Sequence, residues 1–165
     1  MDWEQRLAAL WAAMDQHGDE SFLAAMNVLV DELPNDSAIG AYEQASAFDS
    51  TGDAVSAIPL YRRALSLGLA EDRRRQAVIQ LASSLRNVGA AAESVALLRA
   101  EQALVSDELD DAVSGFLALA LADAGQPHQA LSVALLALSG QMTRYRRSLS
   151  NYAREIGERR TDHEK

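Results

Sequence analysis

Asp49 and Arg86 carry opposite charges and lie 37 residues apart, a spacing that recurs elsewhere in the chain. If the chain folds as repeats of that length, side chains at equivalent positions lie side by side on one face of the stack. A guanidinium at such a position holds a partner's carboxylate through two parallel hydrogen bonds. Ser83 and Asn87 add hydrogen-bonding groups nearby. We therefore expect Asp49, Arg86 and Asn87 to converge on one polar binding site. The alternative is a structural ion pair that fixes the stacking of the repeats.

The sequence gives little support to catalytic chemistry. Its three histidines are isolated, and it contains no HExxH, GxSxG or Walker A motif. It also has no cysteine, which excludes disulfides and thiol chemistry. We therefore predict no enzyme activity, no catalytic residue, no metal site and no cofactor.

The elements that position the polar residues are set by three glycines. Gly52, Gly89 and Gly125 follow one another at steps of 37 and 36 residues. A glycine in a left-handed conformation ends a helix at little cost. Small residues seven positions before and five after each glycine let two helices approach closely at the turn. These small residues are Ala45, Ala57, Ala82, Ser94, Ala118 and Ala130. The period predicts a stack of antiparallel helical hairpins.

The pattern resembles the tetratricopeptide repeat (TPR) across about residues 37–139. Ala64 and Ala137 match the alanine twelve residues after the turn glycine, and Tyr61 matches the aromatic residue nine after it. Segments such as YEQASAFDSTG and FLALALADAG make the chain similar to a family of short bacterial TPR proteins of unknown function. The resemblance implies an all-α chain, an α-α superhelix in the form of a solenoid fragment. It also implies a binding role, a possible homodimer and no catalytic residue.

We predict a single domain over residues 1–157. It consists of a degenerate N-terminal helix pair (1–36), three TPR-like repeats (37–139) and a C-terminal capping helix (140–157), followed by a frayed polar tail (158–165). A solenoid needs such a final helix because its last repeat otherwise exposes an apolar face. The covering stripe is predicted to consist of Tyr145, Leu149, Tyr152 and Ile156.

The first helix of each hairpin lines the concave face of a TPR solenoid, so that face is where we expect a partner to bind. The predicted groove has a polar half on the first two repeats and an apolar half on the third. Its candidate residues are Tyr42, Glu43, Ser46, Asp49, Ser83, Arg86, Asn87, Phe116 and Leu119. For Phe116 and Leu119 the alternative is a place beneath the chain's own C-terminal helix.

Charge and hydropathy limit the classes of partner. The net charge of −9 repels nucleic acid on average. The longest apolar run, 116–122, is too short to cross a bilayer, and the first residues do not read as a signal peptide. We therefore expect a cytoplasmic protein that binds neither nucleic acid nor membranes.

Residues 1–37 carry eight acidic residues and one basic, whereas residues 141–165 carry seven basic and four acidic. The two stretches are either solvated faces or the two sides of a polar contact between molecules.

The leading hypothesis is a non-enzymatic protein–protein interaction module that binds a peptide or protein segment in the concave groove. The alternative is a structural homo-oligomer, a dimer assembled through its end helices with no dedicated groove ligand. An enzyme and a nucleic-acid binder are both disfavoured.

Overall fold

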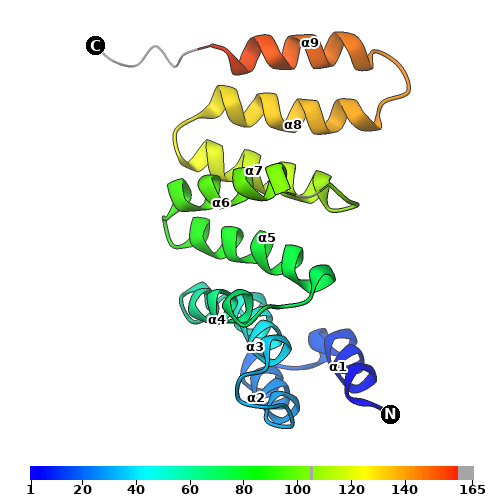
Figure 1. Cartoon of the computed structure of the whole chain (residues 1–165), viewed down its shortest axis with the longest axis vertical. Helices are drawn as coiled ribbons and strands as arrows, with labels where there is room; N and C mark the ends of the chain where they lie inside the picture. Colours follow the sequence, from blue (N-terminus) through cyan, green and yellow to red (C-terminus); the bar gives the residue numbers. More distant parts are fainter. Residues whose placement is uncertain (105, 160–165) are drawn as a thin grey trace. The chain divides into compact units, whose positions relative to one another are not determined.

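The computed structural model describes residues 1–104 and 106–159, apart from the side chains of Glu71 and Asp72. Within these residues the chain forms nine α-helices and one 3₁₀ helix, and no strand (Figure 1). In chain order they are α1 (Trp3–Ala12), η1 (Met14–Gln16), α2 (Asp19–Val30), α3 (Ala38–Ser50), α4 (Ala54–Ser66), α5 (Glu71–Asn87), α6 (Ala91–Leu104), α7 (Asp110–Asp123), α8 (Pro127–Gln141) and α9 (Arg146–Gly157). The predicted all-α class is confirmed, and most of the predicted tail lies outside the described residues.

The chain divides into two compact units, Met1–Ser84 and a second that begins at Leu85. In unit 1, α3 and α4 form a tightly packed hairpin, and α2 packs on α3. In unit 2, α6 packs on α7, α7 on α8, and α8 on α9. The helical hairpins expected from the glycine period are therefore present in both units. The grouping of residues 1–157 into one domain stays a prediction.

The turn glycines have the backbone conformation that the sequence predicts. Gly52, Gly89 and Gly125 have φ angles of +85°, +84° and +74°. A Cβ atom added at any of the three would meet nothing within 4 Å. Glycine is required at these positions because a residue with a side chain is strained at positive φ. Lack of space for a side chain is not the reason.

The small residues predicted for the helix crossings of the first two hairpins are all buried. Ala45, Ala57 and Ala82 are fully buried, and Ser94 is 1% exposed. Ala118, the equivalent residue of the third hairpin, is only half-buried. Helix α4 begins at the expected place because the side chain of its N-cap residue, Asp53, accepts a hydrogen bond from the backbone N–H of Ser56 at 3.0 Å.

The N-terminal pair has its own small core in unit 1. Leu7 on α1 packs with Phe22, Met26 and Leu29 on α2, and Ala47 on α3 joins them. Two polar contacts tie α1 to the end of α2. The indole N–H of Trp3 donates to the backbone oxygen of Leu29 at 2.8 Å. Arg6 forms a two-bonded ion pair with Glu32.

Helix α9 covers α8 in unit 2, although the predicted covering stripe was partly wrong. Ala153 is fully buried, and Leu149 and Ile156 are half-buried. Tyr145 and Tyr152, the other two members of the predicted stripe, are 76% and 61% exposed. Tyr145 is the N-cap residue of α9, in a left-handed conformation outside the helix. Tyr152 precedes the buried Ala153, which places its ring at the edge of the face that meets α8.

Candidate functional site

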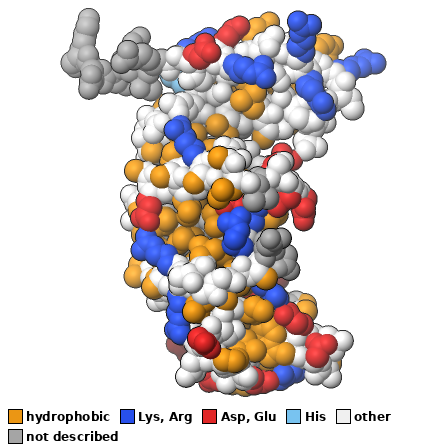
Figure 2. All heavy atoms as spheres, in the orientation of Figure 1, with side chains coloured by type: hydrophobic (Ala, Val, Ile, Leu, Met, Phe, Trp, Pro, Cys, Tyr) orange, Lys and Arg blue, Asp and Glu red, His pale blue; other side chains and the backbone are white. Residues whose placement is uncertain are grey.

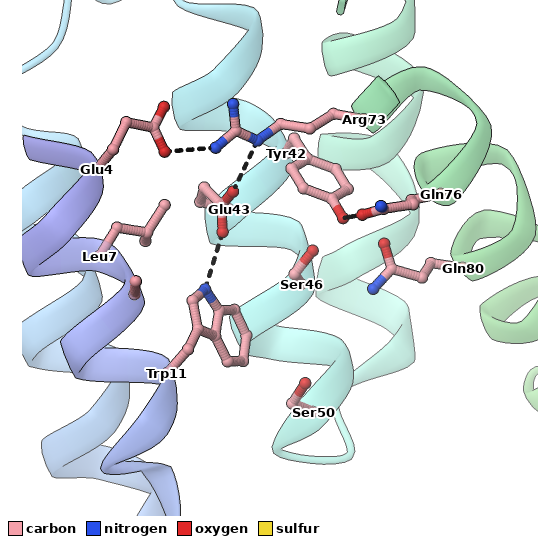
Figure 3. A pocket seen from close by; sticks show the side chains of 11 residues that line it. Glu4, Leu7, Trp11, Tyr42, Glu43, Ser46, Ser50, Arg73, Gln76 and Gln80 are labelled. Atoms are coloured by element: carbon pink, nitrogen blue, oxygen red, sulfur yellow. Dashed lines mark hydrogen bonds and ion pairs between the residues drawn. The ribbon is translucent and has the colours of Figure 1, made fainter. Parts of the chain in front are cut away.

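A polar hollow of about 650 Å³ lies in unit 1. Its walls come from α1, α3 and α5, which alternate along the chain with α2 and α4, and Figure 3 shows their side chains projecting toward one another. The residues that line it are Glu4, Leu7, Ala8, Trp11, Tyr42, Glu43, Ser46, Ser50, Arg73, Gln76 and Gln80. Most of them carry hydrogen-bonding groups, so the hollow is suited to a polar ligand.

Glu43 is the buried charge of the hollow. Its side chain is only 6% exposed. The indole N–H of Trp11 donates to Oε2 at 2.9 Å, and Nε of Arg73 lies 3.4 Å from Oε1. Arg73 also pairs with Glu4 at 2.6 Å. Burial raises the pKa of the Glu43 carboxyl, while the Trp11 bond and the Arg73 charge lower it. These contacts join α1, α3 and α5 at one point, so Glu43 fixes the walls of the hollow.

Tyr42 orients the amide of Gln76. Its hydroxyl donates to Oε1 of Gln76 at 3.0 Å. A side-chain amide held by its oxygen keeps its NH₂ group for another acceptor. Gln80 follows Gln76 by one helical turn, and its Oε1 atom is buried with no hydrogen-bond donor among the described residues. The α5 wall therefore offers the NH₂ group of Gln76 as a donor, and it contains one unsatisfied acceptor, the buried Oε1 atom of Gln80.

Ser46 and Asp49 share a second, internal polar cluster with Tyr61. The Tyr61 hydroxyl lies 3.5 Å from Oγ of Ser46 and 3.4 Å from Oδ2 of Asp49. Ser84 donates to Oδ1 of Asp49 at 2.8 Å. Burial raises the pKa values of both Asp49 and Tyr61. Asp49 thus belongs to the packing between α3, α4 and α5, and it does not line the hollow.

Arg86 has a partner other than the one that the sequence predicted. Its Nη1 atom donates to Oδ2 of Asp123 at 2.9 Å, and its Nη2 atom donates to Asn87 at 3.2 Å. The ion pair of Arg86 with Asp49, given above as the alternative to a binding site, is therefore wrong, because Arg86 pairs with Asp123. The separation of 37 residues does join an ion pair, but the pair is Arg86 with Asp123, one repeat later in the chain. The carboxylate of Asp49 accepts hydrogen bonds from Ser84 and Tyr61 instead.

The nine groove candidates separate into three groups. Tyr42, Glu43 and Ser46 line the hollow. Two more belong to unit 1 without lining it: Asp49 and the half-buried Ser83. The remaining four belong to unit 2: Arg86, Asn87, the half-buried Phe116 and the 48%-exposed Leu119.

Sequence reasoning missed several lining residues. Trp11 and Arg73 both line the hollow, and neither is among the residues that the repeat pattern singles out. A signal for the α5 wall was present, because Gln76 lies 34 residues after Tyr42 and Gln80 lies 34 after Ser46. That separation is the length of the TPR unit.

Two kinds of site do not occur among the described residues. No helix in residues 1–104 or 106–159 has the length and apolar character to cross a membrane. No group of three or more potential metal ligands lies together in the same part of the chain.

Comparison with known families decides the class of the protein. The family described as Tetratrico peptide repeat matches residues 38–156, which include all three predicted repeats. The chain is a member of the TPR family. No curated protein and no solved structure matches it. TPR domains mediate protein–protein interactions and are typically not catalytic, so this protein has the architecture of an interaction module.

Proposed function

We propose that this TPR protein binds a segment of a partner protein in the hollow of unit 1. The observation that carries the proposal is the composition of the walls: three alternate helices contribute eleven lining residues, most of them polar. A volume of about 650 Å³ is within the range of ligand sites, roughly 300–1,000 Å³. It is sufficient for a few residues of an extended peptide.

The side chains at the rim favour an extended backbone as the ligand. Ser50 is exposed on α3, and Gln76 and Gln80 lie one turn apart on α5. Hydroxyls and amides both donate and accept, so these side chains match a chain of alternating C=O and N–H groups. Arg73 is shared by the carboxylates of Glu4 and Glu43, so the charged groups of the hollow are paired with one another and hydrogen bonding is the main means of recognition.

Site-specific photo-crosslinking tests this function with a matched pair of positions. Ala8 lines the hollow, whereas its neighbour Ala9 does not, and both are exposed on α1. A photoreactive phenylalanine at position 8 should give a discrete crosslinked product in the source cells, and the same residue at position 9 should not. Ser50→Arg, which fills the mouth of the hollow, should abolish the product. Equal products at positions 8 and 9, or none at either, would rule out this binding site.

A further inference from the structure

The turn before α9 and the first turn of that helix expose basic and aromatic side chains. We call Arg144, Tyr145 and Arg147 the basic patch. All three are exposed, and neither Arg144 nor Arg147 forms a hydrogen bond or ion pair with a described residue. Figure 2 shows several basic side chains projecting from the surface over α9. Arginine beside exposed tyrosine is the composition of a protein interface more than of a solvated face.

The basic patch is costly to the isolated protein. Arg147 lies in the first turn of α9, where the helix dipole disfavours a cation, and no acidic residue lies there to offset it. Tyr145 has a φ angle of 62°, a conformation that large residues rarely adopt. Its ring is nevertheless exposed, so no buried contact of the ring offsets the strain. Features that lower the stability of the folded protein and make no compensating contact are typical of functional surfaces.

Helix α2 exposes a face of opposite character. We call Glu20, Ala24, Val28 and Asp31 the acidic face, because their spacing places them together on the side away from the core. Val28 is 65% exposed at its centre. Asp31 is the C-cap of α2, where the dipole disfavours an anion, and no basic residue lies in the last turn. Neither Glu20 nor Asp31 forms an ion pair with a described residue.

These two surfaces complement each other in charge, in apolar content and in the sign of their helix ends. We propose that the basic patch of one copy of the chain docks on the acidic face of a second copy. Arg144 and Arg147 then meet Glu20 and Asp31, and the exposed Tyr145 ring covers Ala24 and Val28. An anion beside the start of α9 and a cation beside the end of α2 remove both dipole mismatches at once.

The charge distribution of the sequence selects a second copy as the occupant. Residues 1–37 carry seven more acidic than basic residues, and residues 141–165 carry three more basic than acidic. Opposite potentials of this kind steer association and fix its orientation. Neither surface contains a residue that lines the hollow. The docking of two copies and the binding of a partner segment in the hollow can therefore be tested and refuted separately.

Charge reversal tests the proposal on the full chain. The first variant is Arg144→Glu/Arg147→Glu, and the second is Glu20→Lys/Asp31→Lys. In sedimentation velocity, the wild type should associate in a concentration-dependent manner, and either variant should weaken association at least about tenfold, because like charges then face each other. Association of the wild type should also fall when ionic strength rises from about 0.1 M to about 1 M. Arg63→Glu/Arg99→Glu, an equal charge change at exposed sites of α4 and α6, should leave association unchanged.

A mixture of the two variants gives the decisive comparison. The reversed patch of the first is complementary to the reversed face of the second, and their unaltered surfaces also match. The mixture should therefore associate as the wild type does, although neither variant associates alone. The first variant should melt no lower than the wild type, because Arg147→Glu places at the start of α9 the charge that its dipole favours. In the second variant the gain from Asp31→Lys at the end of α2 offsets the cost of Glu20→Lys in its first turn, so the melting temperature should stay close to that of the wild type. Loss of association is then not unfolding.

Three results of the association experiments would overturn the proposal: a wild type that stays monomeric, a variant that keeps its self-association, or a mixture that fails to recover it. A fourth would come from a binding assay: the wild type does not self-associate but binds duplex DNA or anionic vesicles, and reversal of the basic patch abolishes that binding. The last would assign the patch to a different partner.

Discussion

Arg86 and Asp123 are joined by an ion pair of 2.9 Å across one full repeat of 37 residues. Asp49 occupies the same position one repeat earlier, so the series Asp49, Arg86, Asp123 alternates in sign at equal steps. Arg86 pairs across the second step, whereas the Asp49 carboxylate accepts hydrogen bonds from Tyr61 and Ser84 within unit 1. The alignment of successive repeats therefore indicates which side chains can be neighbours. The hydrogen bonds that each side chain makes locally decide which of those neighbours it pairs with.

The Arg86–Asp123 pair should contribute little stability, because both side chains are partly exposed. A double-mutant cycle with Arg86→Ala and Asp123→Ala should give a coupling energy of about 0.2–1 kcal/mol in urea unfolding. A cycle of Arg86 with Asp111, an exposed carboxylate on the same helix as Asp123, should give a coupling near zero. Equal couplings in the two cycles would contradict the pairing.

Asp49→Asn should change the pH dependence of stability. Burial raises the pKa of Asp49 in the folded protein, so the folded state binds its proton more tightly than the unfolded state does. This contribution to stability is complete below the ordinary pKa of about 3.8 and is lost as pH rises through the folded pKa. The stability of Asp49→Asn relative to wild type should therefore increase with pH across that window. Urea unfolding at a series of pH values measures it, and a difference independent of pH would refute it.

Trp11→Phe should destabilise unit 1 by about 1–3 kcal/mol, because it removes a hydrogen bond to a buried carboxylate. The same change at Trp3 removes a bond to a backbone carbonyl and should cost less, about 0.5–1.5 kcal/mol. In a Glu43→Gln background the cost of Trp11→Phe should shrink, since the charge is gone. Thermal or urea unfolding gives these values, and an unchanged cost in that background would show that the indole acts through packing alone.

Gly157→Ala should destabilise the contact between α8 and α9. A Cβ atom at residue 157 would lie 2.7 Å from Oγ and 2.9 Å from Cβ of Ser132, a short buried side chain with little room to move. Overpacking of this kind typically costs about 1–3 kcal/mol. Gly115→Ala in α7 is the control: a Cβ there meets nothing within 4 Å, so the free energy of unfolding should rise by the helix propensity of alanine, about 0.5–1 kcal/mol. Urea unfolding measures both changes, and a rise in both variants would contradict the tight contact.

The helices and their turns could be predicted because local rules decide them. A glycine at positive φ and small residues at fixed offsets suffice to define a hairpin, as Gly52, Ala45 and Ala57 do. The last helix was harder. Tyr145 and Leu149 share a helical spacing, but Tyr145 is the left-handed N-cap residue of α9 and its ring is 76% exposed, whereas Leu149 is half-buried. Periodicity alone does not fix the residue at which a helix begins.

The binding hollow shows the limit of sequence reasoning at the level of the site. Tyr42, Glu43 and Ser46 were predictable because the first helix of a TPR hairpin lines the concave face. Trp11 and Arg73 were not, because their roles depend on a partner from another helix: Glu43 is their common acceptor, and it lies 32 residues from one and 30 from the other.

By itself, the sequence determined the all-α class, the hairpin period, the turn conformations and the absence of a recognisable catalytic motif, since each depends on residues close together in the chain or on composition. The tertiary structure decided which carboxylates are buried, that Arg86 pairs with Asp123, that Tyr145 and Tyr152 stay in solvent, and that α1, α3 and α5 enclose a polar hollow. Those outcomes depend on competition among side chains from different helices for the same few partners. Distance and burial settle that competition, and both exist only once the helices have packed.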